Sequence, residues 1–291
     1  MKVLAFDIGG TKIYCAVIDE KGQIVGDVEK FSTPQNKIDF EILMKSIIAK
    51  YESEVSAIAI ATAGTVSNQN DRILGSTGNM FKEYPQTDFQ ALSNLPVYLE
   101  NDANAAAWAE YRVGASKGSA VSVLLTLGTG VGGGIIINNK LLKGKSGGAG
   151  EMHFKMRTDC HRKCTCGAYD CYEAYASGTG LKITAQEISG NSEVTTYDVV
   201  AGLEKKDELM TKIFNQWEHD VADGIVGLAN LFDPDCVILS GSMAEYVDVE
   251  KIEKHVNSQI VTAPTKIKKA IAGNYAGMIG VGLLALEAQN G

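Results

Sequence analysis

The sequence predicts an α/β protein with two lobes, because two strand–turn–strand segments with glycine-rich turns lie far apart in the chain. Strand residues 3–6 lead into Asp-Ile-Gly-Gly-Thr-Lys at 7–12, and an apolar run continues at 13–18. A second apolar run, 121–127, leads into Gly-Thr-Gly-Val-Gly-Gly-Gly at 128–134, and three isoleucines follow. A chain of 291 residues, 45% of them hydrophobic, is long enough to form two cores.

Hydrophobic residues recur at helical spacing in some segments and run continuously in others, which predicts the remaining elements. The expected strands are three within 3–31 and single strands near 58–60, 97–99, 121–127, 135–137 and 236–239. The expected helices are 37–51, 103–111, 176–190, 197–203, 205–232 and 276–288. Asn101 or Asp102 directly precedes the alanine-rich helix 103–111 and is well placed as its N-cap.

The turn at 7–12 combines residue types that can hold a metal-bound phosphate. Glycine lets backbone N–H groups approach phosphate oxygens without an intervening side chain. The carboxylate of Asp7, near the end of its strand, can hold Mg²⁺ through water. A Gly-Gly pair also closes ordinary hairpins, so this segment alone is equally consistent with a plain turn. The second turn, at 128–134, favours phosphate binding, since two such hairpins suggest two half-domains facing each other across a nucleotide.

Two other glycine motifs do not meet their structural requirements. Gly128, Gly130 and Gly133 satisfy G-x-G-x-x-G, but a dinucleotide fold needs a helix after this turn and an isoleucine run follows. Gly-Lys-Ser at 144–146 resembles the end of a P-loop, but Asn139 occupies the position that requires glycine. We therefore expect neither a Rossmann site nor a P-loop, and keep a nicotinamide oxidoreductase only as an alternative to be tested.

Charge and hydropathy exclude two classes of partner. The net charge of −8 argues against nucleic-acid binding, and no segment reaches the ~18 uninterrupted apolar residues of a membrane helix. The first strand begins almost at the N-terminus, which leaves no room for a signal peptide or a preceding DNA-binding segment. We therefore expect a cytoplasmic protein that binds neither nucleic acid nor a membrane.

Six cysteines without a secretion signal indicate reduced thiols. Four of them lie within twelve positions, and such clustering favours a metal site over disulfides. The clustered cysteines are Cys160, Cys164, Cys166 and Cys171. The other two lie in apolar strands and are expected in the core: Cys15 and Cys236.

The two glycine turns resemble the phosphate motifs of the superfamily of sugar kinases, heat-shock 70 proteins and actin, and within it the chain resembles a ROK-family sugar kinase. The other matching segments are Glu100-Asn101-Asp102-Ala103-Asn104-Ala105, Gly150-Glu151, Cys164-x-Cys166-Gly167-x-x-x-Cys171-x-Glu173, Asp233-Pro234 and Ala276-Gly277. The resemblance implies a two-lobed ribonuclease H-like fold, that of actin-like ATPases, with the active site in the interlobe cleft. The implied N-terminal lobe is 1–116 plus 276–291, and the C-terminal lobe is 117–275. Dimers are common in the family, which is the one basis for expecting a homodimer.

The resemblance also implies an activity, the ATP- and Mg²⁺-dependent phosphorylation of a free hexose or N-acylhexosamine at its 6-hydroxyl. Glucose is the first expectation, and N-acetylmannosamine, fructose or a β-glucoside are alternatives. A non-catalytic sugar sensor that keeps the fold is an alternative of another class. Retention of Asp102 and of both glycine turns argues against a sensor.

Phosphoryl transfer to an alcohol needs a base near the hydroxyl, and the resemblance gives this role to Asp102. From spacing alone, Asp102 could equally be a helix cap. The implied sugar-binding residues are Gly64, Asn79, Asn101, Asp102, Glu151 and Glu173. Glu173 could instead be a solvated glutamate at a helix start, and Asn79 a plain turn residue. The implied ATP- and phosphate-binding residues are Asp7, Gly9, Gly10, Thr11, Lys12, Gly128, Thr129, Gly130, Gly132, Gly133, Gly241 and Ser242, of which the last two could belong to a generic strand-to-helix turn.

In the family, three cysteines and one histidine hold a structural zinc ion, and the matching cysteines are Cys164, Cys166 and Cys171. The sequence departs from the family at the histidine, because Phe154 occupies the aligned place and His153 lies one residue earlier. We expect His153 to be the fourth ligand, with Cys160 or His161 as alternatives. The remaining histidines are expected to be solvated or packed: His219, on the predicted helix 205–232, and His255.

Overall fold

A computed structural model describes residues 1–75, 80–158 and 162–290 of the chain. Contacts between residues divide the chain into two compact units. The first unit consists of Met1–Gly118, Gly134–Gly150 and Ile271–Gly291, and the second of Ser119–Gly133 and Glu151–Ala270. Each unit is therefore assembled from segments that are distant in sequence.

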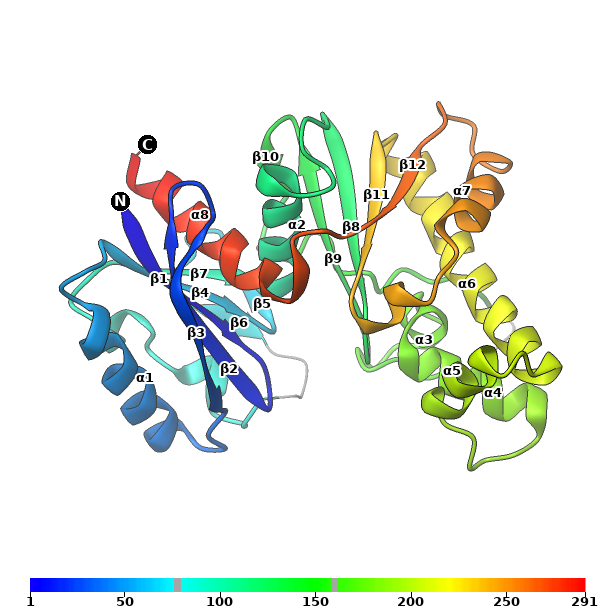
Figure 1. The fold of residues 1–291 in the computed structure, drawn as a ribbon, viewed down its shortest axis with the longest axis horizontal. Helices are drawn as coiled ribbons and strands as arrows, with labels where there is room; N and C mark the ends of the chain where they lie inside the picture. Colours follow the sequence, from blue (N-terminus) through cyan, green and yellow to red (C-terminus); the bar gives the residue numbers. More distant parts are fainter. Residues whose placement is uncertain (76–79, 159–161, 291) are drawn as a thin grey trace. The chain divides into compact units, whose positions relative to one another are not determined.

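The first unit is built on a mixed five-stranded sheet with the order β3-β2-β1-β4-β7 (Figure 1). Its strands are β1 (Lys2–Ile8), β2 (Lys12–Asp19), β3 (Ile24–Ser32), β4 (Ala57–Thr62) and β7 (Val97–Asn101). β1, β2 and β3 form an antiparallel meander, whereas β1, β4 and β7 run parallel. All six residues of β4 are buried, as expected for a parallel strand covered on both faces.

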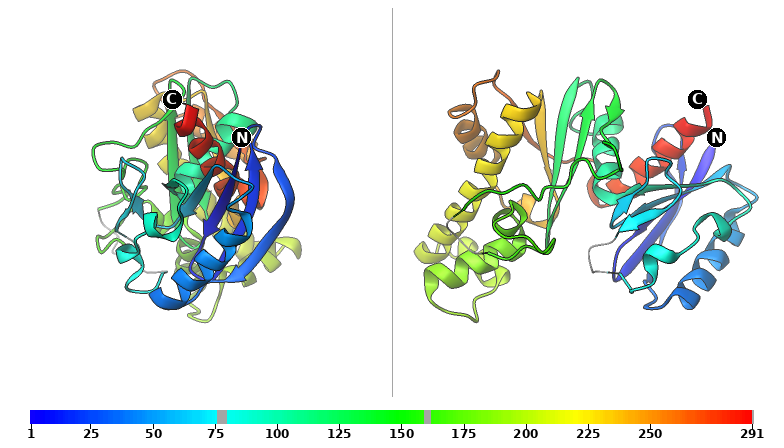
Figure 2. Two further views of the ribbon diagram at one scale, coloured as in Figure 1. Left: turned by 90° about the vertical axis from the view of Figure 1, so that its left-hand side faces the viewer. Right: turned by 180° about the vertical axis from the view of Figure 1, so that it is seen from behind.

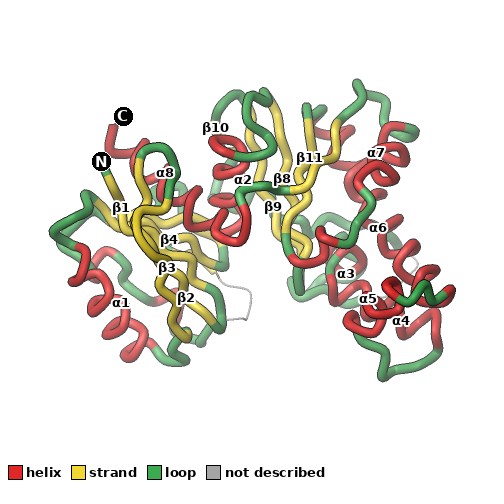
Figure 3. Tube along the Cα trace, viewed as in Figure 1, coloured by secondary structure: helices red, strands yellow, loops and turns green. Residues whose placement is uncertain are grey.

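Helices cover both faces of this sheet (Figure 3). Alternate residues of β1, Leu4 and Phe6 among them, pack in one core with α1 (Lys37–Tyr51). Val3 and Ala5 point to the opposite face and pack with α8 (Ala276–Asn290) in a second core. α8 also lies against α2 (Asp102–Val113), so closely that a methyl group at Gly280 would overlap a carbonyl oxygen of that helix. Small residues on this face thus allow the last helix of the chain to complete the first unit.

A second five-stranded sheet has the order β10-β9-β8-β11-β12. Its strands are β8 (Val121–Leu127), β9 (Val131–Ile137), β10 (Lys140–Leu141), β11 (Cys236–Ser240) and β12 (Lys266–Lys269). β11 runs parallel to both β8 and β12. Two short strands, β5 (Thr65–Val66) and β6 (Ile73–Gly75), pair separately in the first unit.

The second unit contains five helices among its described residues: α3 (Glu173–Ala176), α4 (Gly178–Ser189), α5 (Thr196–Glu204), α6 (Glu208–Phe232) and α7 (Val249–Asn257). Side chains cap the N-termini of α4 to α7, as Ser177 does for α4 and Asp207 for α6. Figure 2 shows α7, in orange-brown, beside the yellow part of α6. Short 3₁₀ turns occur at Tyr84–Gln86, Gln90–Leu92, Ser242–Glu245 and Gly273–Tyr275.

The helices and strands expected from hydrophobic spacing are present, with small shifts at their ends. The helix expected at 205–232 begins later, at Glu208, because Lys206 has a left-handed backbone conformation and Asp207 is the N-cap. The helix expected near 176–190 begins at Gly178, since the extended backbone of Ser177 separates α3 from α4. In the described part of the chain, no helix combines the length and the apolar character that spanning a bilayer requires.

Candidate functional site

In the first unit, three parallel strands bring the candidate residues to one edge of the sheet. Asp7 of β1 lies in register with Ala61 of β4, and Thr62 of β4 with Asn101 of β7. The carboxyl ends of β1, β4 and β7 therefore lie side by side, which is where ligands of open α/β sheets bind. The side-chain amide of Asn101 donates to the carbonyl of Gly64 at 3.1 Å, joining the segments that follow β4 and β7.

The first glycine turn is held by hydrogen bonds from outside it. Within the turn, the N–H of Gly9 donates to the carbonyl of Lys12 at 2.9 Å. Thr33 donates its hydroxyl to the carbonyl of Gly9 at 2.6 Å and its N–H to that of Thr11 at 3.1 Å. A third bond runs from the side chain of Gln35 to the carbonyl of Gly10 at 3.3 Å. Donors of the protein thus hydrogen-bond to the carbonyl oxygens of the turn, and these bonds fix its shape.

Asp7 is a buried carboxylate beside a second acidic group. Burial, together with the negative charge of Asp102, raises the pKa of Asp7 from an ordinary 3.8 to about 7. The first turn of α8 approaches the same side chain, since a Cβ at Gly277 would lie 3.1 Å from Asp7 Oδ2. Two carboxylates that destabilise each other's charge favour the binding of a cation between or beside them.

The hydrogen bonds around Asp102 show which residue caps α2. Asn101, not Asp102, is the N-cap of α2, because its Oδ1 accepts the N–H groups of Ala103 and Asn104, both at 3.0 Å. Asp102 is the first residue of the helix, and its Oδ1 accepts the N–H of Ala103 at 2.8 Å. The carboxylate is therefore held at a helix N-terminus, where the helix dipole favours negative charge.

Sequence reasoning did not assign a role to Glu100, which is fully buried directly before these residues. Its Oε2 accepts the ammonium of Lys143 and the amide of Asn70, both at 2.9 Å. Its Oε1 accepts the backbone N–H of Asn101 at 2.9 Å and the side-chain amide of Asn104 at 3.1 Å. Glu100 therefore fixes the end of β7 and the start of α2 through these hydrogen bonds. Its position before Asn-Asp was a signal, but its bond to Lys143 joins residues too distant in sequence to infer.

In the second unit, three backbone segments meet around the second glycine turn. The turn is closed by the N–H of Gly128, which donates to the carbonyl of Gly130 at 3.0 Å. The N-terminus of α4 contacts it, because the N–H of Gly178 donates to the carbonyl of Gly128 at 2.8 Å. The loop after β11 also lies here, since a Cβ at Gly241 would lie 2.5 Å from the carbonyl oxygen of Leu127. Gly241 has φ of 87°, a conformation that favours glycine.

The predicted phosphate residues Gly132 and Gly133 belong to β9 rather than to the turn itself. The N–H of Gly132 donates to the hydroxyl of Thr126 at 3.0 Å, within the same hairpin. A strand therefore follows the G-x-G-x-x-G glycines, where a dinucleotide fold has a helix. The alternative of a nicotinamide oxidoreductase that uses these glycines is wrong.

Glu173 links the second glycine turn to the cysteine segment. Its Oε2 accepts the N–H of Val131, at the end of the turn, at 3.1 Å. Its Oε1 accepts the hydroxyl of Thr165, and the thiol of Cys164 lies 3.4 Å from the same oxygen. Glu173 is only 9% exposed, so the alternative of a solvated glutamate at a helix start is wrong.

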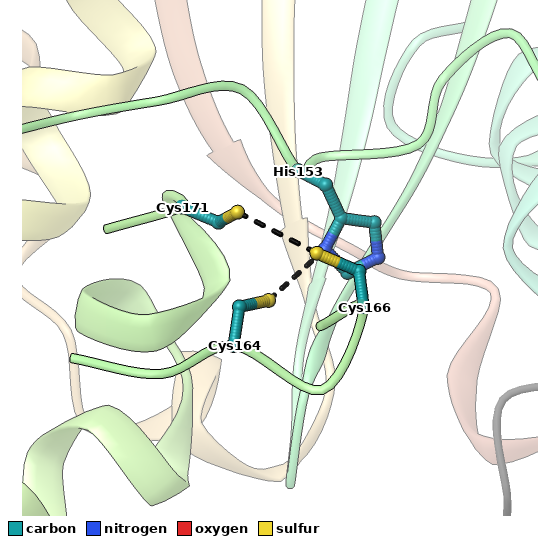
Figure 4. Close-up of side chains that lie close together, drawn as sticks. All are labelled: His153, Cys164, Cys166 and Cys171. Carbon is teal, nitrogen blue, oxygen red and sulfur yellow. Dashed lines mark hydrogen bonds between the residues drawn. The ribbon is translucent and has the colours of Figure 1, made fainter. Parts of the chain in front are cut away.

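The cysteine segment brings three thiols and one imidazole together (Figure 4). The ligand atoms of His153, Cys164, Cys166 and Cys171 all lie within 4.8 Å of one another. Cys166 Sγ lies 3.6 Å from Cys171 Sγ, and Cys164 Sγ lies 3.3 Å from His153 Nδ1. A tetrahedral zinc ion with bonds of 2.0–2.3 Å separates its ligand atoms by roughly 3.3–3.8 Å. The four side chains are thus spaced as such an ion requires.

The second ring nitrogen of His153 faces a carboxylate, because His153 Nε2 lies 3.7 Å from Glu151 Oε2. A carboxylate on the far side of a ligating imidazole fixes its tautomer and orientation. Phe154 stands at the position of the family's histidine. Its ring stacks on Tyr172 instead, with centroids 5.0 Å apart. The one-residue shift of the histidine is therefore accommodated by the local backbone.

The thiols of this cluster differ in the direction in which their pKa values are shifted. Burial raises the pKa of Cys164 to about 12, whereas a hydrogen bond from the backbone N–H of Ala168 lowers the pKa of Cys166. The other candidates near this cluster, Cys160 and His161, lie outside the described residues, as does the predicted sugar-binding residue Asn79.

Comparison with known proteins agrees with these features. The family model described as the ROK family matches residues 3–288. The chain belongs to the ROK family. The predicted family is thereby confirmed, and the match covers both glycine turns and the cysteine segment.

Curated ROK relatives include two kinds of kinase. The glucokinase of Streptomyces coelicolor is 33% identical over 313 residues, covering 98% of this chain and 97% of that protein. The N-acetylmannosamine kinase of Yersinia pseudotuberculosis is 32% identical over 291 residues, covering 98% of each. Among solved structures, the ROK family glucokinase from Streptomyces griseus in complex with glucose and AMPPNP matches with a TM-score of 0.82. That match is 30% identical and covers 99% of this chain and 100% of the other, which confirms the expected fold class.

Proposed function

We propose that this ROK chain is an ATP-dependent kinase that phosphorylates a free hexose or N-acylhexosamine at its 6-hydroxyl. The observation that carries the proposal is the proximity of Asp7 and Asp102 at one sheet edge, beside a glycine turn whose shape is fixed by hydrogen bonds. A metal-binding carboxylate and a separate base near a phosphate site are the parts that phosphoryl transfer to an alcohol requires.

Asp102 is the proposed catalytic base. It accepts the proton of the sugar hydroxyl as that oxygen bonds to the γ-phosphorus of ATP, while the bond from phosphorus to the bridging oxygen of ADP breaks. An ordinary carboxylate basicity suffices because the proton leaves late, when the hydroxyl oxygen is already bonding. Glu100 and Asn101 hold the backbone at this position, so the base keeps its place when the sugar binds.

Asp7 is the residue that would hold Mg²⁺, through water. The bound ion supplies neutralisation of charge on the phosphate oxygens. A buried carboxylate with a pKa near 7 fits this role, because its anionic form gains most from an adjacent cation. The proposed phosphate-binding residues are Gly9, Gly10, Thr11 and Lys12 in the first turn and Gly128, Thr129 and Gly130 in the second, with Gly132 and Gly133 next to the latter. Gly241 and Ser242 are proposed on the adenosine side.

The sugar is proposed to contact Gly64, Asn79, Asn101, Asp102, Glu151 and Glu173. Carboxylates and amides that pair with several hydroxyls reject the wrong epimer, because a buried polar group would be left without a partner. Zinc is proposed at His153, Cys164, Cys166 and Cys171, whose spacing supports it. These residues would hold the ion next to Glu151 and Glu173, and a bound ion would order the segment that carries them.

Glucose is the first proposed substrate and N-acetylmannosamine the second. The two relatives support them about equally, with 33% and 32% identity to this chain. Fructose and a β-glucoside are the remaining alternatives. Discrimination among these sugars is expected to depend on His153, the shifted histidine of the zinc segment.

The experiment that tests the proposal is a coupled assay of ADP release with ATP, Mg²⁺ and each of the four sugars in turn. Turnover with one sugar supports the kinase and identifies its substrate. Tight binding of a sugar by calorimetry without turnover of any would contradict the kinase and support the sensor. If no sugar is turned over and none binds, both the kinase and the sensor are overturned.

A further inference from the structure

A second group of side chains of the types that ligate metals lies in the second unit and takes no part in the proposed kinase chemistry. His219 and Asp223 lie one helical turn apart on α6, and His255 lies in the last turn of α7. Residues four apart share one face of a helix. α7 packs beside α6 (Figure 2), and the side chain of His255 reaches Asp223 on that face.

The three ligand atoms converge on one point. Asp223 Oδ1 lies 2.9 Å from His255 Nε2 and 3.4 Å from His219 Nδ1, and all three atoms lie within 4.8 Å of one another. The two imidazole rings stand edge to face with centroids 4.3 Å apart. Nitrogen and oxygen ligands of a tetrahedral ion, each at about 2.0–2.1 Å, are separated by about 3.3 Å. The observed separations need only small adjustments to meet this geometry.

Neighbouring contacts hold the two helices in this arrangement. Lys251 of α7 binds Glu218 of α6 at 2.5 Å and Asn215 at 2.7 Å. The other oxygen of Glu218 accepts the backbone N–H of Asp248, the N-cap of α7, at 2.8 Å. Glu218 is almost fully buried. These bonds lie one turn or less from His219, so the ligand set is positioned by the scaffold before any ion binds.

An ion can reach this group from solvent. The side chain of His219 is 55% exposed, and those of Asp223 and His255 are partly exposed. His219 also borders a surface pocket of about 880 Å³, together with Asn215 and Gln216. The side-chain amide of Gln259 lies 2.7 Å from His255 Nε2, and metal binding would replace that contact.

We propose that His219, Asp223 and His255 form a binding site for a divalent transition-metal ion of the Zn²⁺, Co²⁺ or Ni²⁺ class. Two imidazoles and one carboxylate are borderline ligands that suit these ions, whereas Mg²⁺ and Ca²⁺ require mostly oxygen ligands. Water completes the coordination. The ion cross-links α6 to α7, so it stabilises the second unit without touching the reacting groups.

The test is the Zn²⁺ content of the intact chain after equilibrium dialysis against buffered Zn²⁺. Wild-type protein is expected to bind one equivalent more than His255→Ala, and the same one more than His219→Ala. Asp223→Asn is expected to bind the ion at least tenfold more weakly. Glu250→Gln, which removes an exposed carboxylate from α7, is the matched control and should keep the wild-type content.

Cys166→Ser separates this site from the cysteine cluster. In that background, His255→Ala must still remove one equivalent of Zn²⁺. Zn²⁺ should also raise the thermal midpoint of wild type more than that of His255→Ala, and far-ultraviolet circular dichroism checks that both are folded. Equal Zn²⁺ content in wild type, His219→Ala and His255→Ala would overturn the proposal. Kinase activity does not enter this test, so the two proposals fail independently.

Discussion

At the scale of single residues, two carboxylates at one sheet edge have different surroundings. Asp7 is buried and carries a pKa raised to about 7. Asp102 opens a helix whose cap is supplied by its neighbour, Asn101. The first environment favours binding a cation, and the second favours a fixed anion that can receive a proton. These differences give each residue its own test.

Asp102→Asn should lower kcat by about 10² to 10⁴, because the amide keeps the size of the side chain but cannot accept the proton. Sugar affinity, measured by calorimetry, should stay close to that of wild type. Asp27→Asn is the control, since it removes a carboxylate from the exposed edge strand β3. Near-normal turnover in Asp102→Asn would remove the base assignment.

The pKa of Asp7 makes stability depend on pH in a stated direction. Below about pH 4 the carboxyl is protonated in both folded and unfolded chains, and it has no effect. Between pH 4 and 7 the unfolded chain ionises first, so the folded state loses stability as pH rises. The loss is complete above pH 7 and is on the order of 4 kcal/mol.

Asp7→Asn should remove this loss in protein without added Mg²⁺ or nucleotide. Its urea midpoint should match that of wild type at pH 4 and exceed it at pH 8. Titrations at several pH values measure the difference, in which the other ionisable groups largely cancel. A gap between the two proteins that stays constant across this range would contradict the assignment.

At the scale of elements, close approach of backbones explains glycine in the last helix. A methyl group at Gly280 of α8 would overlap the carbonyl oxygen of Ala105 in α2. Gly280→Ala should therefore destabilise the protein by about 1–3 kcal/mol or more. Gly227→Ala in α6 is the matched control, because a Cβ there meets nothing within 4 Å. The control should gain up to about 1 kcal/mol of stability from helix propensity. Equal thermal midpoints for Gly280→Ala and wild type would refute the packing argument.

The bond between Glu173 and the N–H of Val131 predicts an effect on nucleotide binding. Glu173→Gln removes a charged acceptor from the glycine turn and should raise the dissociation constant for AMPPNP about tenfold. Glu193→Gln, which alters an exposed carboxylate between α4 and α5, should not change it. If Glu173 served the sugar alone, the KM for sugar would rise while AMPPNP affinity stayed at its wild-type value.

Local pattern predicted most elements and the candidates that lie within single segments. Asp7 with its turn, and Asp102 after its strand, follow from residues adjacent in sequence. The partners of Glu100 and Glu173 could not be predicted, because Lys143 and Val131 reach them only through tertiary packing. His153 was expected as a ligand in spite of its shift, and its Nδ1 lies 3.3 Å from Cys164 Sγ. His219 and His255 were expected to be solvated or packed, because the convergence of α6 and α7 is not visible in a helical pattern.

At the scale of the whole molecule, the composition predicts that the protein does not bind DNA. Phosphate-backbone binding needs clustered positive charge, and this chain carries a net charge of −8. A fluorescently labelled DNA duplex should show no change in anisotropy with the protein in buffer of physiological ionic strength. Salt-dependent binding at micromolar protein would contradict this expectation and would require a local basic surface.

The contact between Gly277 and Asp7 joins the last helix of the chain to its first strand. During translation, β1 leaves the ribosome well before α8. The surroundings of Asp7 therefore stay incomplete until α8 has been synthesised. A chain that stalls before α8 would expose the apolar face of β1 and β4, which marks it for recognition by chaperones.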